Sequence, residues 1–374
     1  MIIGVDAREI QNGAVTGIGR SLANFIKYFG ENESVHQLVL FSERGISQNF
    51  SDNTSQVIIN GVPAIIWDQL KLPSALKANN IDLFYSPYYK VPLLSRVPMV
   101  NQILDLMYLA FPPYSNRLGF WKRLYYATFG KAYSKKALNI ITDSEHAKSD
   151  IIKYWNVRPE KIQVIPLGLA NRYKPVQDPD LLNKVKIKLG LPERYILYLG
   201  NFKPHKNINS LVHAFKKIAQ RFSDYKLVLA GPLDEHGQVI QKLVSDLKLT
   251  PRVLFTDTIK EKDNPEALLS MAEVFVFPTL YEGFGLPPLE AMACGTPVVA
   301  SNLTSVPEVV GDAGVSVDPL DINQISQAIA GLIESPARRK TYTEYGLERA
   351  SQFREKDTTA RLYNLIISIA EKIQ

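Results

Sequence analysis

Two continuous apolar runs enclose a glycine-rich turn and a short helix, and this segment limits the possible folds of the chain most strongly. The runs are residues 274–277 and 296–301. Apolar runs of this length without polar alternation are typical of strands buried on both faces of a parallel sheet. Between them, Pro287 favours the start of a helix and Gly295 favours its end. The segment therefore predicts a strand–helix–strand unit of an α/β domain.

Strand-length runs alternate with helical patterns along the rest of the chain. This alternation predicts a doubly wound α/β protein with parallel sheets. A polar, proline-containing segment at 170–190 interrupts the pattern, so we expect a linker there and two sheets instead of one. Apolar residues at helical spacing predict a helix at 208–222, and Asn264 is expected to cap another. The expected strands are 1–6, 37–42, 81–86, 98–104, 138–143, 161–166, 195–199, 226–230, 252–256, 274–278, 296–301 and 314–317.

The glycine turn after residue 277 has the ingredients of an anion site. Free N–H groups at a helix N-terminus and the helix dipole both favour negative charge. Glu290 falls near the start of the helix, and Glu282 lies on the loop before it. A carboxylate is a poor phosphate ligand but readily accepts hydrogen bonds from hydroxyl groups. A phosphate site next to hydroxyl-binding carboxylates suggests a sugar nucleotide.

Residues 282–301 carry a resemblance to a known family. The run E-G-F-G-L-P-P-L-E-A-M-A-C-G-T-P-V-V-A-S resembles the E-x₇-E signature of family-4 retaining glycosyltransferases with the GT-B fold. The resemblance implies two Rossmann-like domains that face a central cleft. It implies an acceptor-side domain at 1–170 and a donor-binding domain at 171–354. It also implies that a C-terminal helix within 355–374 packs back on the first domain.

A second candidate anion site follows the strand expected at 195–199. On the residues of the loop 200–207 alone, a solvated basic turn is the simpler interpretation. The loop resembles the family motif G-x-x-x-P-x-K-N, which implies that Lys206 neutralises the donor diphosphate. As a loop lysine, Lys206 is expected to bury little surface. The family commonly has arginine in place of Asn201 and histidine in place of Leu104, so the chain departs from the pattern at two positions.

The resemblance implies a role for each matched residue. Glu282 and Lys206 are the implied catalytic residues, and Asp105 is placed on the acceptor side. Residues 16–20 contain a partial G-x-G turn, which could indicate a dinucleotide site. The sequence disfavours this interpretation, because the acidic residue expected about 20 residues later is poorly placed. The implied nucleotide-sugar-binding residues are Gly17, Asn201, Ile259, Gly283, Phe284, Gly285, Leu286 and Glu290.

No metal ion and no cofactor are expected. The five histidines show no H-E-x-x-H spacing and no cysteine partner. Asp178-Pro179-Asp180 imitates the D-x-D of metal-dependent glycosyltransferases, but it lies in the expected linker and not at a strand end. Cys294 is the single cysteine, which excludes an internal disulfide, favours a reducing cytosol and fits a small buried side chain.

Charge and hydropathy bear on the compartment. The net charge of +6 fits an anionic substrate, an acidic membrane surface or a merely soluble protein. No apolar run approaches the ~20 residues that span a bilayer, and the N-terminus lacks a signal-like leader, so we expect a cytoplasmic protein. Peripheral contact with the inner face of a membrane stays open. In segment 117–136, Leu118, Trp121, Tyr125, Phe129 and Ala132 form a helical stripe expected to face the core.

The resemblance implies a retaining hexosyltransferase, and the absence of a metal-binding pattern in the sequence agrees with a metal-independent one. It would move a hexose from a nucleotide diphosphate sugar to a carbohydrate or lipid-linked acceptor in polysaccharide or glycolipid assembly. Family frequency puts UDP-glucose first and GDP-mannose next, and no nucleic-acid partner is expected. Leu104 and Asn201 motivate one alternative, a catalytically silent nucleotide-sugar-binding partner. A GT-B-like sugar-nucleotide epimerase is the other.

Overall fold

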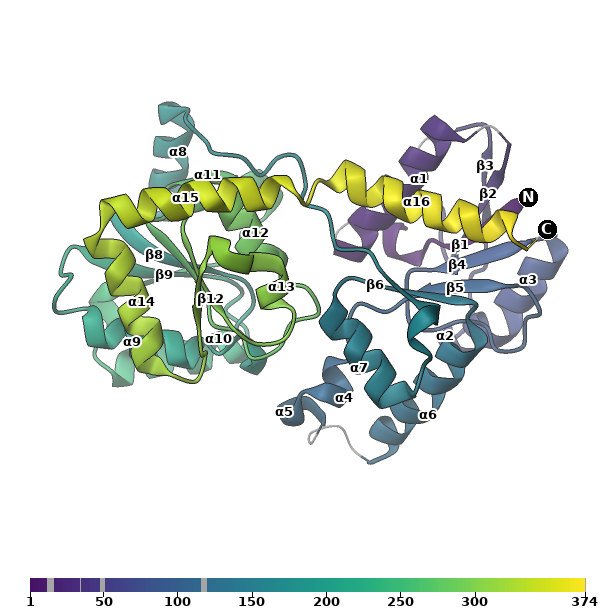
Figure 1. Ribbon diagram of the computed structural model, residues 1–374, viewed down its shortest axis with the longest axis horizontal. Coiled ribbons are helices and arrows are strands. Elements are labelled where there is room, and N and C mark those ends of the chain that lie inside the picture. Colours follow the sequence, from purple (N-terminus) through teal and green to yellow (C-terminus); the bar gives the residue numbers. More distant parts are fainter. Residues whose placement is uncertain (12–16, 34, 48–50, 116–119, 374) are drawn as a thin grey trace. The chain divides into compact units, whose positions relative to one another are not determined.

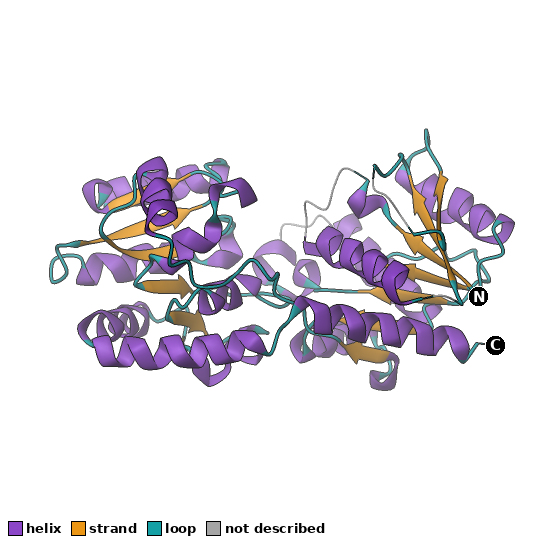
Figure 2. Ribbon diagram, turned by 90° about the horizontal axis from the view of Figure 1, so that it is seen from above, coloured by secondary structure: helices purple, strands orange, loops and turns teal. Residues whose placement is uncertain are grey.

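The computed structural model describes residues 1–11, 17–33, 35–47, 51–115 and 120–373. It divides into two compact units, coloured by sequence in Figure 1. Unit 1 comprises Met1–Gly168 and Glu355–Gln374, and unit 2 comprises Leu169–Arg354. Each unit has its own parallel sheet with helices on both faces, as Figure 2 shows. This architecture confirms the predicted α/β class.

Unit 1 is built on a seven-stranded sheet with the order β3-β2-β1-β4-β5-β6-β7, in which all neighbouring strands are parallel. The strand order reverses between β1 and β4, and ligands of doubly wound sheets bind outside the carboxyl ends at such a switch point. The strands are β1 Ile2–Asp6, β2 Gln37–Ser42, β3 Thr54–Ile58, β4 Leu83–Ser86, β5 Met99–Gln102, β6 Asn139–Thr142 and β7 Ile162–Val164.

The helices of unit 1 cover both faces of this sheet and bury its apolar residues. One core joins Val5 and Tyr85 of the strands to Phe25 of α1, and another joins Phe41 and Trp67 on the opposite face. The helices are α1 Gly17–Asn32, α2 Ala64–Ile66, α3 Leu72–Ala78, α4 Met107–Ala110, α5 Pro112–Ser115, α6 Phe120–Lys136, α7 Glu145–Trp155 and α16 Glu355–Glu371, with a π-helical turn Trp67–Lys71 between α2 and α3.

The C-terminal helix α16 is part of unit 1 although it follows unit 2 in sequence. Its apolar residues Leu362, Ile366 and Ile369 are buried in the core that also holds α1, and the two helices lie side by side in Figure 1. Gly168 permits a close approach where the chain returns, because a Cβ there would lie 2.4 Å from the Cα of Glu355. Burial of this apolar stripe therefore holds α16 on the N-terminal unit.

Unit 2 contains a six-stranded parallel sheet with the order β10-β9-β8-β11-β12-β13. Its switch point lies between β8 and β11. The strands are β8 Arg194–Leu199, β9 Tyr225–Ala230, β10 Val253–Thr256, β11 Val274–Phe277, β12 Val298–Ser301 and β13 Val315–Val317. The helices are α8 Pro179–Leu189, α9 Ile208–Ile218, α10 Glu235–Asp246, α11 Pro265–Ser270, α12 Leu286–Ala293, α13 Val306–Val310, α14 Ile322–Glu334 and α15 Pro336–Ser351.

The expected linker at 170–190 is wrong, because unit 2 begins at Leu169 and this segment contains α8. The side chain of Asp178 accepts hydrogen bonds from the backbone N–H groups of residues 180 and 181, and Pro179 starts the helix. Gly190 ends it with φ of +63°. The motif Asp178-Pro179-Asp180 is thus a helix cap, which satisfies N–H groups that have no partner within the helix.

Each predicted strand is present within a few residues of its expected bounds, but the sequence did not predict β3. This edge strand is half-exposed and begins Thr54-Ser55-Gln56, so it lacks the buried apolar run by which the other strands were found. Helix α9 ends at Ile218, four residues before its expected end. Asn264 precedes α11, but with φ of +55° its side chain makes no capping hydrogen bond.

The helical stripe expected on α6 is not buried where the structure describes it. Tyr125 and Ala132 are half-buried, and Phe129 is 44% exposed. Leu118 lies outside the described residues, and the side chain of Trp121 is not described either. Among the residues described, none of the helices combines the length and apolarity needed to cross a bilayer.

Candidate active site

The two residues predicted to be catalytic meet at the switch point of unit 2. Lys206 ends a 3-10 turn, Pro204–Lys206, in the loop after β8, and Glu282 lies in the loop after β11. The Nζ atom of Lys206 is 2.6 Å from Oε1 of Glu282. Both side chains are buried, with 11% and 12% exposed. The structure therefore brings together two residues 76 positions apart and corrects the expectation that Lys206 buries little surface.

Hydrogen bonds to main-chain carbonyls hold the two loops against each other. The N–H of Leu280 donates to the carbonyl of His205 at 2.7 Å. The side-chain amide of Asn207 donates to the carbonyls of Pro278 and Pro319 at 3.1 and 2.6 Å. Since these contacts bridge the ends of β8, β11 and β13, the positions of Lys206 and Glu282 are fixed by the sheet itself.

Three hydroxyl groups that sequence reasoning missed surround Glu282. The hydroxyl of Thr279 lies 2.8 Å from Oε1 of Glu282. The N–H of Glu282 donates to the hydroxyl of Thr304 at 3.1 Å, and Ser305 donates to the carbonyls of Glu282 and Phe284. Thr304 and Ser305 lie within four residues of the carboxyl end of the buried strand β12, and this position is the signal that could have revealed them.

Burial and nearby positive charge keep His205 neutral. Its pKa is lowered to about 3, first by burial and then by Lys206, Lys203 and His236. Lys206 also lies 5.1 Å from the centroid of the Phe277 ring. The positive charge at this point of the loop therefore comes from Lys206 and not from its histidine neighbour.

The glycine turn and the helix after β11 form as predicted. Gly285 precedes α12 with φ of +104°, a conformation that favours glycine, and prolines follow Leu286 in the first turn. Gly283 and Phe284 lie in the same turn, and Glu290 is half-buried in the second turn of α12. Cys294 ends the helix as a buried thiol, and burial is the main reason that its pKa rises to about 12.

The remaining residues of unit 2 that are predicted to bind the donor lie in the loops after β8 and β10. Asn201 follows β8, where its carbonyl accepts a hydrogen bond from the hydroxyl of Tyr198 at 2.6 Å. Ile259 follows β10 and is half-buried. Among the described residues, no cluster of three or more His, Cys, Asp or Glu side chains is arranged to hold a metal ion.

In unit 1, Gly17 and Asp105 also follow the carboxyl ends of strands. Gly17 is the first residue of α1 and is exposed. Asp105 follows β5, and its Oδ1 accepts a hydrogen bond from the N–H of Met107 at 3.0 Å. Their roles toward donor and acceptor stay predictions.

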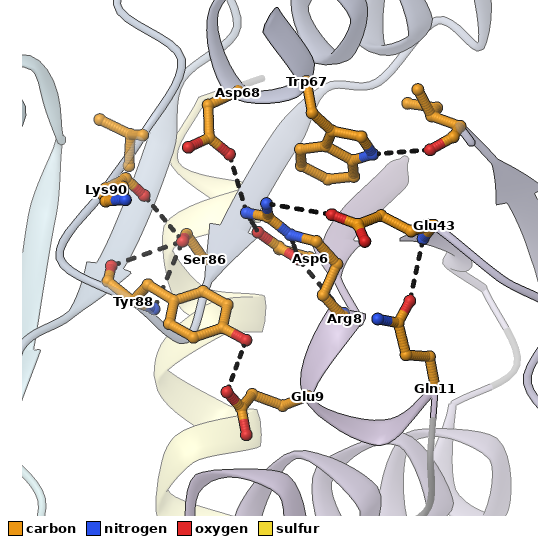
Figure 3. A network of polar contacts seen from close by, with 12 residues as sticks. Asp6, Arg8, Glu9, Gln11, Glu43, Trp67, Asp68, Ser86, Tyr88 and Lys90 are labelled. Atoms are coloured by element: carbon orange, nitrogen blue, oxygen red, sulfur yellow. Dashed lines mark hydrogen bonds and ion pairs between the residues drawn. The ribbon is translucent and has the colours of Figure 1, made fainter. Parts of the chain in front are cut away.

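A buried ionic network near the same edge of the unit 1 sheet was not predicted. Figure 3 shows Arg8 beneath the ring of Trp67, with its Nη2 2.6 Å from Asp6 and 2.8 Å from Asp68. Burial raises the pKa of Asp6, and the bonds to Arg8 oppose that rise. Tyr88 joins the network through its hydroxyl, which donates to Glu9 at 2.8 Å.

Two family models match the chain. The model described as "Glycosyl transferases group 1" matches residues 182–349, and "Glycosyltransferase Family 4" matches residues 15–170. These matches support a glycosyltransferase of family 4. The predicted site residues Lys206, Glu282 and Glu290 lie inside the first match, and Gly17 and Asp105 lie inside the second.

Curated proteins similar to this chain include O-antigen mannosyltransferases. O-antigen chain mannosyltransferase B of Escherichia coli is 35% identical over 226 residues, which cover 60% of this chain and 59% of the relative. O-antigen chain mannosyltransferase RfbU of Salmonella typhimurium is 29% identical over 277 residues, which cover 74% and 72%. The chain spans only 27% of a further relative, the serotype-specific mannosyltransferase WbdA of Escherichia coli.

Solved structures confirm the GT-B fold. Sucrose-phosphate synthase from Thermosynechococcus elongatus superposes with a TM-score of 0.77 at 21% identity, covering 99% of both chains. Anabaena HepE in complex with UDP superposes with a TM-score of 0.76 at 18% identity, covering 98% of this chain and 99% of that one.

Proposed function

We propose that the protein is a retaining glycosyltransferase that moves a hexose from a nucleotide diphosphate sugar to an acceptor hydroxyl. The observation that carries the proposal is the contact between Lys206 and Glu282 at the switch point of unit 2. A cation suited to phosphate and a carboxylate suited to sugar hydroxyls lie side by side there, beside the N-terminus of α12. This combination matches the two chemical parts of a nucleotide sugar.

Lys206 would stabilise the departing diphosphate. An ammonium group has three N–H donors, and the bond to Glu282 uses one of them. Negative charge on the diphosphate grows as the bond from the sugar C1 to the phosphate oxygen breaks. A fixed cation and the N–H groups of Gly285 and Leu286 act most strongly at that stage, because they are already oriented.

The two glutamates would have different duties. Glu282, held by Thr279, Thr304 and Ser305, would accept hydrogen bonds from the hydroxyls of the transferred sugar. Glu290, in the second turn of α12, would accept hydrogen bonds from the ribose. Backbone near Ile259 would contact the base.

Retention and metal independence complete the proposal. The acceptor oxygen would form its bond to C1 on the face from which the phosphate leaves, and the proton of the acceptor hydroxyl would pass to a phosphate oxygen. This route needs no protein base. The low pKa of His205 agrees with it, because an imidazole with a pKa of about 3 is a weak base near neutral pH. Lys206 and the N-terminus of α12 would balance the phosphate charge without a metal ion.

The names of the relatives change the order of the donors. On family frequency, the sequence favoured UDP-glucose and then GDP-mannose. The relatives described above are named mannosyltransferases, and another, from Mycolicibacterium smegmatis, is named as GDP-mannose-dependent at 32% identity over 188 residues. We therefore propose mannose as the sugar and GDP-mannose as the first donor to test, in polysaccharide or glycolipid assembly.

Turnover of GDP-mannose and UDP-glucose with a panel of oligosaccharide acceptors tests the proposal. We expect nucleoside diphosphate to appear in proportion to glycosylated product, and the new linkage to keep the anomeric configuration of the donor by NMR. A silent binding partner would release no nucleotide, and an epimerase would change the donor sugar without an acceptor. Inversion at C1 would contradict the retaining mechanism.

A further inference from the structure

Two buried charges of opposite sign meet at the switch point of unit 2. The Nζ atom of Lys206 lies 2.6 Å from Oε1 of Glu282, and the two side chains are 11% and 12% exposed. The neighbouring His205 adds no charge near neutral pH, because burial and nearby cations lower its pKa to about 3. A phosphate group bound to Lys206 would therefore meet a cation whose charge is already balanced, with a carboxylate next to it.

Hydrogen bonds hold the carboxylate of Glu282 beside Lys206. The hydroxyl of Thr279 donates to the same Oε1 atom at 2.8 Å. The backbone of Glu282 is fixed on both sides of its Cα. Its N–H donates to the hydroxyl of Thr304 at 3.1 Å, and its carbonyl accepts a hydrogen bond from the hydroxyl of Ser305 at 3.0 Å. The negative charge is therefore part of the site when a ligand arrives, and it acts on every group that Lys206 binds.

A nucleotide sugar and the nucleoside diphosphate that it leaves behind meet this pair of charges differently. The diphosphate of the donor is esterified at both ends, so it lacks the second ionisation of a terminal phosphate, whose pKa is about 6. The donor also carries sugar hydroxyls, which can donate hydrogen bonds to a carboxylate. Cleavage of the bond from C1 to the phosphate oxygen removes these hydroxyls. Once the proton taken from the acceptor dissociates, the product also has a further negative charge.

We propose that Glu282 makes this site favour the intact donor over the nucleoside diphosphate product, because its carboxylate accepts hydrogen bonds from the donor sugar but repels the terminal phosphate of the product. Lys206 attracts both ligands, whereas Glu282 attracts one and opposes the other. Loss of the sugar in the reaction therefore weakens binding at the site and speeds release of the product. This inference rests on the proposed function, and it gives Glu282 a role after the transfer step.

Calorimetric titration of GDP and GDP-mannose into the full chain, without acceptor, tests this role, with UDP and UDP-glucose titrated in parallel. Glu282→Gln keeps the size of the side chain and removes its charge. It should bind the free diphosphate at least fivefold more tightly than the wild type, since two like charges about 4 Å apart disfavour each other by about fivefold even in bulk water. The intact donor should gain less, because an amide is a weaker acceptor of its hydroxyls than a carboxylate.

Two further variants separate the effect of charge from a loss of stability. Glu282→Asp keeps the charge and should bind the free diphosphate within about twofold of the wild type. Glu273→Gln is the matched control, because Glu273 contacts Arg194 at 2.8 Å and its side chain is 22% exposed. Arg194 is the first residue of β8, and Glu273 directly precedes β11. This ion pair thus lies at the amino ends of the two strands whose carboxyl ends form the site, and its loss should leave nucleotide affinity unchanged.

The outcomes decide between this role and a purely structural one. If Glu282→Gln is unfolded at the titration temperature, the wild type decides, because it should bind the nucleotide sugar at least threefold more tightly than the free diphosphate. Equal or weaker binding of the nucleotide sugar overturns the proposal. So does an affinity of Glu282→Gln for the diphosphate no greater than that of the wild type, an equal gain in Glu273→Gln, or a wild type that binds no nucleotide. Donor turnover with unchanged diphosphate affinity in Glu282→Gln retains the proposed function and removes this role of Glu282. Tighter diphosphate binding by that variant, without donor turnover by the wild type, does the reverse.

Discussion

The contact between Lys206 and Glu282 makes a quantitative prediction about stability. Both side chains are about nine-tenths buried, so removal of one partner leaves a charge that water reaches poorly. Breaking buried pairs in this way costs about 3–5 kcal/mol. We take about 3 kcal/mol for Lys206→Met, because the hydroxyl of Thr279 still contacts the carboxylate. A loss of 1 kcal/mol lowers the melting temperature of a unit of this size by about 2–4 °C, so we expect a fall of about 6–12 °C.

Differential scanning calorimetry of the full chain measures this fall in the transition of unit 2. Glu282→Gln should show a similar fall, and the double variant should fall by less than the sum, since it leaves no unpaired charge. Lys186→Met is the matched control, because Lys186 contacts Glu193 at 2.5 Å on the surface, where Glu193 is 85% exposed. Such pairs contribute about 0–1 kcal/mol. If Lys206→Met melted like Lys186→Met, the argument that burial makes this pair costly to break would be wrong.

Three further predictions concern the site. Glu290→Ala should mainly weaken binding of the free nucleoside diphosphate, whereas Glu282→Ala should mainly lower kcat; the opposite pattern in a titration and a rate measurement would reverse their duties. The pKa of His205 is about 3 in the folded chain and about 6.5 in the unfolded one. The unfolded chain therefore takes up a proton on this residue below pH 6.5, whereas the folded chain does not. As a result, the free energy of unfolding is unaffected above pH 6.5 and declines by up to about 1.4 kcal/mol per pH unit between pH 6.5 and 3. His205→Asn should reduce the loss of stability between pH 7.5 and 5.5 in urea titrations, and an unchanged loss would contradict the assignment. Turnover should persist in excess EDTA, since Lys206 supplies the charge, and activity restored only by Mn²⁺ or Mg²⁺ would defeat the metal-free mechanism.

Local patterns predicted most of the fold. Buried strands of parallel sheets are continuous apolar runs, and these are visible without knowledge of their neighbours. The edge strand β3 has no such run, because none of its residues Thr54–Ile58 is buried. The helix at Pro179–Leu189 was missed although Asp178, Pro179 and Gly190 mark its ends by capping rules. Helix α9 was identified by the periodic spacing of its apolar residues. Helix α8 has a charged surface with Val185 as its buried residue, so it shows no such periodicity.

Only those residues of the candidate site that belong to a sequence motif could be predicted. Lys206 and Glu282 stood in recognisable loops, but their 2.6 Å contact depends on the adjacency of β8 and β11, which are far apart in sequence. Thr279 and Ser305 carry no motif, and their positions around Glu282 follow from the sheet. The same holds for Arg8, whose partner Asp68 comes from a helical turn 60 residues later. Long-range pairing of this kind is a property of the folded chain.

Calorimetric titration of GDP and UDP into the chain, in the presence of EDTA, tests the central claim that Lys206 binds the donor diphosphate. We predict that one of the two nucleotides binds the wild type and Lys186→Met with equal affinity. Lys206→Met should bind it at least tenfold more weakly, because a hydrogen bond to a charged group contributes about 1.5–3 kcal/mol. Equal affinity of Lys206→Met and the wild type, with the variant folded at the titration temperature, would contradict the account.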